Sequence, residues 1–123
     1  MKKAGYVDGF VLIVPKKNFA AYRRMATMAG KLWRKHGALD YKECVADDMK
    51  TPCGMPFPKL VKLRKGEAVW YSFITYKSRA HRDAVNKRVM KDPVMNDPKW
   101  ATMKMPFDMK RMTSGGFKIV VHR

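Results

Sequence analysis

The segment from Val69 to Tyr76 reads Val-Trp-Tyr-Ser-Phe-Ile-Thr-Tyr, which is typical of a β-strand with apolar residues on both faces. Alternate side chains of a strand point to opposite sides, so one face holds Val69, Tyr71 and Phe73, and the other holds Trp70, Ile74 and Tyr76. One layer of helices covers only one face of a sheet. The other face therefore needs a second layer, which we predict to be a second copy of the chain or a ligand.

The composition is that of a single globular domain spanning residues 1–123, since 46% of the residues are hydrophobic. No apolar run approaches the roughly 18 residues that span a membrane. Asp8 also interrupts the apolar stretch that follows the N-terminal lysines, which argues against a signal peptide. The two cysteines, Cys44 and Cys53, lack a metal-binding spacing, so we expect reduced thiols in a cytoplasmic protein.

Side-chain periodicity and capping residues divide the chain into six main elements. We predict strands over 6–14, 39–45, 68–76 and 117–121, a helix between Asn18 and Gly37, and a second helix from Ser78 to about Met90. Residues 60–64 are predicted to add a short strand or its approach. A methionine-rich insertion precedes the last strand.

The resulting order, βαββαβ, predicts an α+β, ferredoxin-like fold. Its two right-handed crossovers give a four-stranded antiparallel sheet with both helices on one face. Joined to a partner through its open face, this unit would form a dimeric α/β barrel.

The first predicted helix is amphipathic, and its outer side carries only positive charge. No acidic residue occurs between positions 16 and 35, and the whole chain has a formal charge of +17. We consider two roles for this charge: binding nucleic acid or another polyanion, or keeping a solvated surface soluble. The side chains concerned are Lys16, Lys17, Arg23, Arg24, Lys31, Arg34 and Lys35.

Four segments resemble a known family when they are taken together: Tyr6-Val7-Asp8-Gly9-Phe10, Gly30 to Leu39, Met105-Pro106-Phe107-Asp108 and Gly115-Gly116-Phe117. They are similar to the YbaA-like bacterial proteins, a family of unknown function in the dimeric α/β-barrel superfamily. The resemblance covers nearly the whole chain. It implies a ferredoxin-like homodimer with a ligand cavity between the subunits, but it supplies no catalytic residues.

The favoured hypothesis is a homodimer that binds an apolar or aromatic small molecule between its subunits, and that acts as a cofactor-free enzyme if it is an enzyme. We predict no cofactor and no metal. The candidate ligand-binding residues are Asp8, Trp33, His36, Trp70, Tyr71, Phe73, Tyr76 and Arg111. The alternative is a non-catalytic basic module that contacts nucleic acid through its helix faces.

Three of these candidates have competing structural roles. His36, at the end of the first helix, is either a general base or a cap on the terminal carbonyls. Asp8 lies in an apolar strand and needs a partner, which Arg111 or a backbone turn can supply. That pair would either bind an anionic group or act as a strut.

Other chemistry has weaker support in the sequence. Glu43 and Asp47 with His36 can be combined into a divalent metal site, but their spacing matches no metal motif. Cys44 is predicted to be buried and inert. The aromatic residues near Tyr71 mimic part of an RNA-recognition motif, but its basic-glycine opening is missing, so we reject that assignment.

Overall fold

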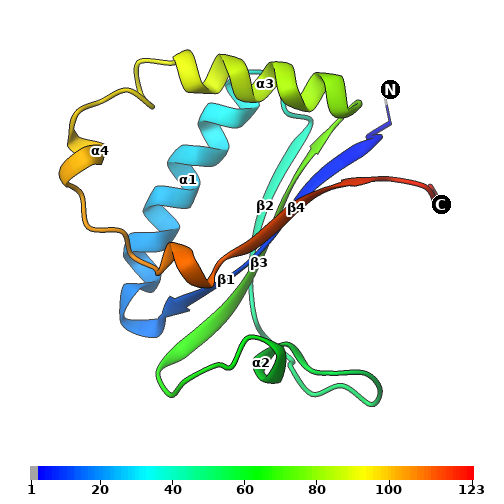
Figure 1. Ribbon diagram of the computed structural model, residues 1–123, viewed down its shortest axis with the longest axis vertical. Helices are drawn as coiled ribbons and strands as arrows, with labels where there is room; N and C mark the ends of the chain where they lie inside the picture. Colours follow the sequence, from blue (N-terminus) through cyan, green and yellow to red (C-terminus); the bar gives the residue numbers. More distant parts are fainter. Residues whose placement is uncertain (1–2) are drawn as a thin grey trace.

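The computed structural model describes residues 3–123 as one four-stranded antiparallel sheet with helices on one face (Figure 1). The strands are β1 (Tyr6–Pro15), β2 (Asp40–Val45), β3 (Glu67–Tyr76) and β4 (Thr113–Lys118), and their order in the sheet is β2-β3-β1-β4. The main helices are α1 (Phe19–Lys35) and α3 (Arg79–Lys91). The short elements are the 3-10 turns η1 (Lys16–Asn18) and η2 (Met109–Arg111) and the helices α2 (Phe57–Leu60) and α4 (Lys99–Thr102). The predicted βαββαβ order is confirmed.

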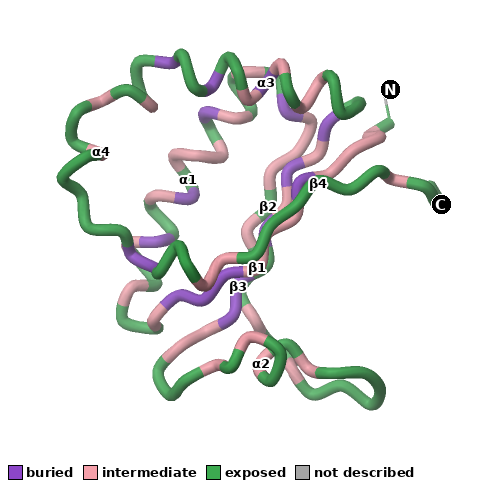
Figure 2. The backbone as a smooth tube through the Cα atoms, in the orientation of Figure 1, coloured by how far each residue is buried: buried purple, intermediate pink, exposed green. Residues whose placement is uncertain are grey.

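The two faces of β3 differ as its alternation predicts. Trp70, Ile74 and Tyr76 are buried beneath the helices, whereas Tyr71 keeps 46% of its surface exposed. Strand register places Val11, Cys44 and Tyr71 on the same side. We call this side the open face, and it also carries Phe73 and the exposed Phe117. Within the sheet, Figure 2 shows the buried residues in β1 and β3, while β4 is exposed along its length.

The core between sheet and helices has two clusters. The first packs Leu12, Val14, Tyr22, Ala26, Trp70 and Phe107 near the start of α1. The second packs Leu32, Ala38, Ile74, Tyr76, Val85 and Val89 where α1 and α3 approach each other. Because these residues come from both helices and the two central strands, they fix the helices on the sheet.

The predicted helix boundaries are largely confirmed. Ser78 caps α3, because its hydroxyl accepts a hydrogen bond from the His81 N–H at 3.1 Å. Gly37 follows α1 with a φ of 111°, a left-handed value that favours glycine. Asn18 stands before α1, but its side chain does not cap the helix. It instead donates to the Pro106 carbonyl at 3.0 Å.

Two predicted strands are wrong in position. Residues 60–64 form no strand: Pro56 and Pro58 favour a first helical turn, so the chain forms α2, and Lys62 then takes a positive φ. The last strand is Thr113–Lys118 and not 117–121. Gly115 and Gly116 belong to this strand, because they pair with Gly9 and Asp8 of β1.

The segment around α2 covers one end of the open face. Val69 points to that face and yet is only 4% exposed. A pocket of about 260 Å³ lies between this segment and the sheet, with Phe57 on one side and Val69 and Tyr71 on the other. Part of the second layer predicted for β3 therefore comes from the chain itself. Within residues 3–123, no helix is both long and apolar enough to cross a membrane.

Candidate ligand-binding site

A pocket of about 310 Å³ lies between the helices and the sheet, beside β4. We call it the Asp8 pocket. Strand β1 supplies the carboxylate, α3 supplies polar side chains, and β4 supplies a wall with almost no side chains. It is lined by Asp8, Phe10, Trp33, Ile74, Arg82, Asn86, Met90, Ser114, Gly115 and Gly116.

Asp8 is paired with Arg82 of α3. Arg82 Nη1 donates to Asp8 Oδ1 at 2.7 Å, and the two side chains are 19% and 11% exposed. Burial raises the pKa of Asp8 above its ordinary value, and the Arg82 guanidinium partly opposes this rise. Arg82 is itself held in place, because it also bonds Asp83 at 2.7 Å and lies 5.0 Å from the centre of the Tyr6 ring.

Trp33 and Asn86 form a second polar contact in the Asp8 pocket. Trp33 Nε1 donates to Asn86 Oδ1 at 3.0 Å. An indole N–H is only a donor, so the oxygen of the Asn86 amide must face it and the NH₂ group is directed elsewhere. That NH₂ group donates no hydrogen bond within residues 3–123. It is therefore available to a bound molecule.

Tyr76 adds a buried hydroxyl at the base of this region. The residue is fully buried, and within the described part of the chain its hydroxyl has no partner with hydrogen-bond geometry. Burial and then the negative charge of Asp8 raise the pKa of Tyr76, with Trp33 and Arg82 acting against the rise. The Tyr76 hydroxyl therefore lies within electrostatic reach of both Asp8 and Trp33.

The structure thus brings three of the predicted ligand-binding residues together: Asp8, Trp33 and Tyr76. Arg82 and Asn86 were missed by the sequence analysis. The signal was present, since Ser78 begins a helix and Arg82 and Asn86 recur at a spacing of four on one side of it. The facing partner could not be chosen without the packing of α3 on β1.

The eight candidates, which were predicted to surround a ligand between subunits, do not all lie together within the chain. Trp70 packs in the other core cluster, against Phe19 and Tyr22, at ring distances of 5.4 Å and 4.8 Å. Tyr71 and Phe73 lie on the open face, with their ring centres 5.8 Å apart. The sheet itself separates these two aromatic groups, because alternate residues of β3 point to opposite sides.

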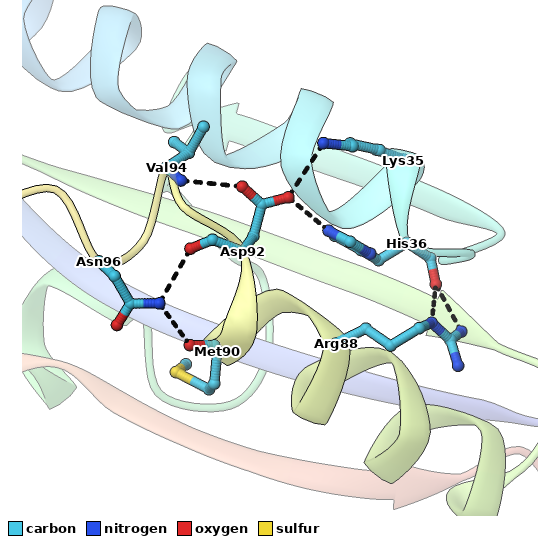
Figure 3. Close-up of polar contacts among 7 residues, drawn as sticks. All are labelled: Lys35, His36, Arg88, Met90, Asp92, Val94 and Asn96. Carbon is cyan, nitrogen blue, oxygen red and sulfur yellow. Dashed lines mark hydrogen bonds and ion pairs between the residues drawn. The ribbon is translucent and has the colours of Figure 1, made fainter.

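His36 belongs to a different polar cluster, at the end of α1 (Figure 3). Its Nε2 lies 2.7 Å from Asp92 Oδ2, and Lys35 Nζ lies 3.0 Å from the same oxygen. The Val94 N–H donates to Asp92 Oδ1 at 2.8 Å. The hydrogen bond from His36 is the main reason that the pKa of Asp92 is well below its ordinary value.

The His36 ring therefore ties the end of α1 to the residues that follow α3. It does not cap the terminal carbonyls of α1, which was its predicted structural role. The exposed end of the helix is covered instead by Arg88, whose guanidinium donates to the His36 carbonyl at 2.6 Å. His36 does not line the Asp8 pocket.

Arg111 is not the partner of Asp8, so that proposed pair is wrong. Arg111 Nη1 lies 2.5 Å from Glu67 Oε2, and its Nη2 donates to the Lys62 carbonyl at 3.1 Å. These contacts hold η2 against the start of β3. The residue is at the far end of β1 from Asp8, because Glu67 pairs with Pro15 in the sheet.

The acidic residues suggested for a metal do not converge. Glu43 accepts hydrogen bonds from the hydroxyls of Tyr22 at 2.8 Å and Tyr41 at 2.7 Å. Burial raises the pKa of Glu43, and these two hydrogen bonds oppose the rise. Among residues 3–123, no three His, Cys, Asp or Glu side chains are grouped as metal ligands. Cys44 is exposed, contrary to prediction, because the open face leaves it uncovered.

Two of the predicted cationic side chains of η1 and α1 form contacts within the chain, and the others are exposed. Arg34 donates to the carbonyls of Ala38 and Leu39, and Lys35 pairs with Asp92. Within the described residues, the other five cations are exposed and form no ion pair: Lys16, Lys17, Arg23, Arg24 and Lys31.

Comparison with known proteins places the chain in a family. A family model described as "Protein of unknown function (DUF1428)" matches residues 5–109. The chain belongs to this family. It is 42% identical over 116 residues to the "Uncharacterized protein YbaA" of Escherichia coli K12, covering 94% of this chain and 97% of that protein. The Shigella flexneri protein of the same name matches equally well. The predicted resemblance is confirmed.

A solved structure supports the fold. The crystal structure of a dimeric ferredoxin-like protein from an uncultured marine organism matches with a TM-score of 0.56 and 14% sequence identity. The match covers 97% of this chain and 99% of that chain. The ferredoxin-like α+β prediction is therefore confirmed. The family match includes every residue of the Asp8 pocket from Asp8 to Met90, whereas the β4 wall lies beyond its end.

Proposed function

We propose that the protein is a homodimer that binds a small, neutral aromatic molecule in the Asp8 pocket. The observation that carries the proposal is the convergence of the Asp8–Arg82 pair and the Asn86 amide in a pocket whose other walls are largely apolar. Asp8 and Arg82 cancel in charge, which favours a neutral ligand. The Asn86 NH₂ group can donate to that ligand, and an oxygen of Asp8 can accept from it. A hydroxyl group on an aromatic ring satisfies both.

The apolar part of the pocket supports an aromatic ligand. Phe10, Trp33, Ile74 and Met90 supply ring and hydrocarbon surface around the polar groups. Pockets of a few hundred cubic ångströms with apolar walls and a few convergent polar groups are the usual form of small-molecule sites. This pocket lies within one chain on the helix-covered face, and so differs from the predicted cavity between subunits.

The same contacts allow proton transfer without a cofactor. A carboxylate that accepts a hydrogen bond from a bound hydroxyl can also remove its proton. The raised pKa of Asp8 makes it a stronger base than an ordinary aspartate. Arg82 and the Asn86 amide lie where they can stabilise the negative charge left on the ligand. Proton abstraction is therefore the reaction we assign to the site if the protein is an enzyme.

The open face supports the dimer. It presents Tyr71 and Phe73 from β3 and Phe117 from β4, the two strands that flank β1, and Tyr71 and Phe117 are 46% and 59% exposed. Clustered exposed aromatic residues are typical of protein interfaces. The similar marine protein is described as dimeric. The free thiols of Cys44 and Cys53 are consistent with a reducing, cytoplasmic compartment.

The ligand proposal is tested with phenol and toluene, which have the same ring and differ in the hydroxyl group. We expect saturation-transfer NMR to detect phenol bound to the protein and little toluene. Asn86→Ala should weaken phenol binding by about fivefold, because one neutral hydrogen bond contributes about 1 kcal/mol. Asn18→Ala, which lies at the other end of the molecule, is the control. Equal binding of phenol and toluene would contradict the proposal.

The basic-module alternative keeps one supporting observation, the five exposed cations of η1 and the outer side of α1. Backbone phosphates would bind such a surface without regard to sequence, and increasing salt would weaken the binding. Fluorescence anisotropy with a labelled single-stranded oligonucleotide tests this alternative. Arg23→Glu with Arg24→Glu should abolish binding, whereas Arg34→Glu should have less effect because Arg34 is engaged with backbone carbonyls. No anisotropy change at low salt would eliminate it.

A further inference from the structure

A second pocket of about 310 Å³ lies between α1 and the segment that follows α3. We call it the methionine pocket. Its lining comes from one side of α1 and from the insertion around α4. The residues are Met25, Met28, Ala29, Leu32, Trp33, Val94, Met95, Trp100 and Met105.

The methionine pocket has no side-chain polar group to offer. Its two possible donors are already used, since Trp33 Nε1 donates to Asn86 Oδ1 and Trp100 Nε1 donates to the Val94 carbonyl at 2.5 Å. The remaining lining side chains are aliphatic or thioether groups. Thioethers are polarisable and adapt to irregular shapes, so such a pocket favours a flexible hydrocarbon group. A charged or hydrogen-bonding group would lose its hydration there.

The two pockets share a wall. Trp33 lines both the Asp8 pocket and the methionine pocket. In Figure 1, α1 lies between the α4 segment and the sheet, and α3 crosses one end of it. The indole of Trp33 therefore borders both a polar pocket and an apolar one, and its own N–H donates to Asn86 on the polar side.

A short turn joins the walls of the two pockets (Figure 3). Met90 lines the Asp8 pocket, and Val94 and Met95 line the methionine pocket. The Asn96 side chain donates to the Met90 carbonyl at 3.0 Å. The Asp92 carboxylate accepts a hydrogen bond from the Val94 N–H at 2.8 Å. The two lining segments are therefore fixed relative to each other by hydrogen bonds and not only by the chain.

We infer that the ligand of this protein is amphipathic, with a hydroxylated aromatic head in the Asp8 pocket and a hydrocarbon chain in the methionine pocket. The inference rests on the proposed function, because the head is the group assigned there. It adds a ligand class, an alkyl-substituted phenol, and assigns the chain to Met28, Ala29 and Met105. Trp33 would contact both parts of such a ligand.

The test is a chain-length series: phenol, para-propylphenol and para-heptylphenol, measured by isothermal titration calorimetry on the full-length protein. Each methylene buried in the methionine pocket should tighten binding by about fourfold. Ala29→Phe should fill the pocket and remove this dependence while leaving phenol binding unchanged. Ala20→Phe adds the same ring to the exposed outer side of α1 and is the matched control.

A second variant covers the case in which Ala29→Phe disturbs folding. Met105→Glu places a charge in the opposite wall at a residue that is already 39% exposed, and it should also remove the dependence on chain length. Phenol binding with no dependence on chain length, or the same dependence in both pocket variants, would overturn the inference and leave the proposed function standing. Absence of binding by every phenol would overturn both.

Discussion

At the scale of single residues, the Asp8–Arg82 pair has the strongest influence on the site. Both side chains are largely buried and 2.7 Å apart, so neither can lose its partner without leaving a charge in a poorly solvated place. Burial makes the carboxylate reluctant to ionise, and the guanidinium makes ionisation tolerable. The pair therefore places the Asp8 carboxylate, with its raised pKa, beside the pocket. Arg82 prevents that carboxylate from being an isolated buried charge.

The first prediction is that Arg82→Met destabilises the protein by about 3 kcal/mol at neutral pH. The variant leaves the Asp8 carboxylate unpaired. The pKa of Asp8 is already raised above its ordinary value of 3.8, and losing Arg82 raises it further. A raised folded pKa contributes stability below the unfolded pKa that is lost as pH rises through the folded one. The penalty should therefore grow with pH above 3.8. Urea denaturation at acid and neutral pH measures it, and a pH-independent penalty would contradict this account.

Asp92 has the opposite pH behaviour. Its pKa is lowered from the ordinary value of 3.8 by hydrogen bonds from His36, the Val94 N–H and Lys35. A lowered folded pKa contributes stability above the unfolded pKa that is lost as pH falls through the folded one. We predict that wild-type protein loses stability as pH falls below 3.8, and that Asp92→Asn loses much less over the same range. Thermal denaturation as a function of pH compares them, with Asp97→Asn as an exposed control.

At the scale of elements, most of the fold could be predicted from sequence because the patterns are local. The periodicity of α1, the cap at Ser78, the glycine at position 37 and the two apolar faces of β3 all correspond to observed structure. Strand β4 was misplaced because its residues, Thr113 to Lys118, are all exposed and the first four of the six are threonine, serine or glycine. Such a strand has no apolar alternation to read, and only its pairing with β1 defines it.

The site was harder to predict than the fold. Asp8 and Trp33 could be singled out as a carboxylate in an apolar strand and an aromatic residue on a helix. Their partners Arg82 and Asn86 lie far along the chain, on a helix whose apolar periodicity is weak. Which of the many arginines meets Asp8 depends on how α3 crosses the sheet, and sequence patterns do not give crossing geometry.

Strand β4 supports a prediction on its two glycines. A methyl group on Gly116 would collide with the Tyr6 hydroxyl and come within 2.9 Å of its ring. On Gly115 it would lie 3.8 Å from the Phe117 ring, an ordinary contact. Gly116→Ala should therefore destabilise the protein by about 2 kcal/mol, and Gly115→Ala by much less. Equal melting temperatures for the two variants would show that Tyr6 does not restrict β4.

At the scale of the whole molecule, the helices cover one face of the sheet, and we propose that a second copy of the chain covers the open face. Tyr71→Lys places a charge at the centre of the open face and should weaken the dimer by roughly a hundredfold. Phe19→Lys is the control, because Phe19 is 43% exposed, close to the 46% of Tyr71, but lies on the helix side. Sedimentation velocity over a concentration series reports the change. Wild-type protein that sediments as a monomer at every concentration would eliminate the dimer.

The exposed thiol of Cys44 lies on the same face as Tyr71, whereas Cys53 lies in the loop before α2. The two natural cysteines can therefore report whether the open face is covered, and no mutation is needed. In the proposed dimer, a thiol-specific reagent should modify Cys53 quickly and Cys44 slowly, and dilution should bring the two rates together. The ratio of the two modification rates would then measure how often the two sheets of the dimer separate.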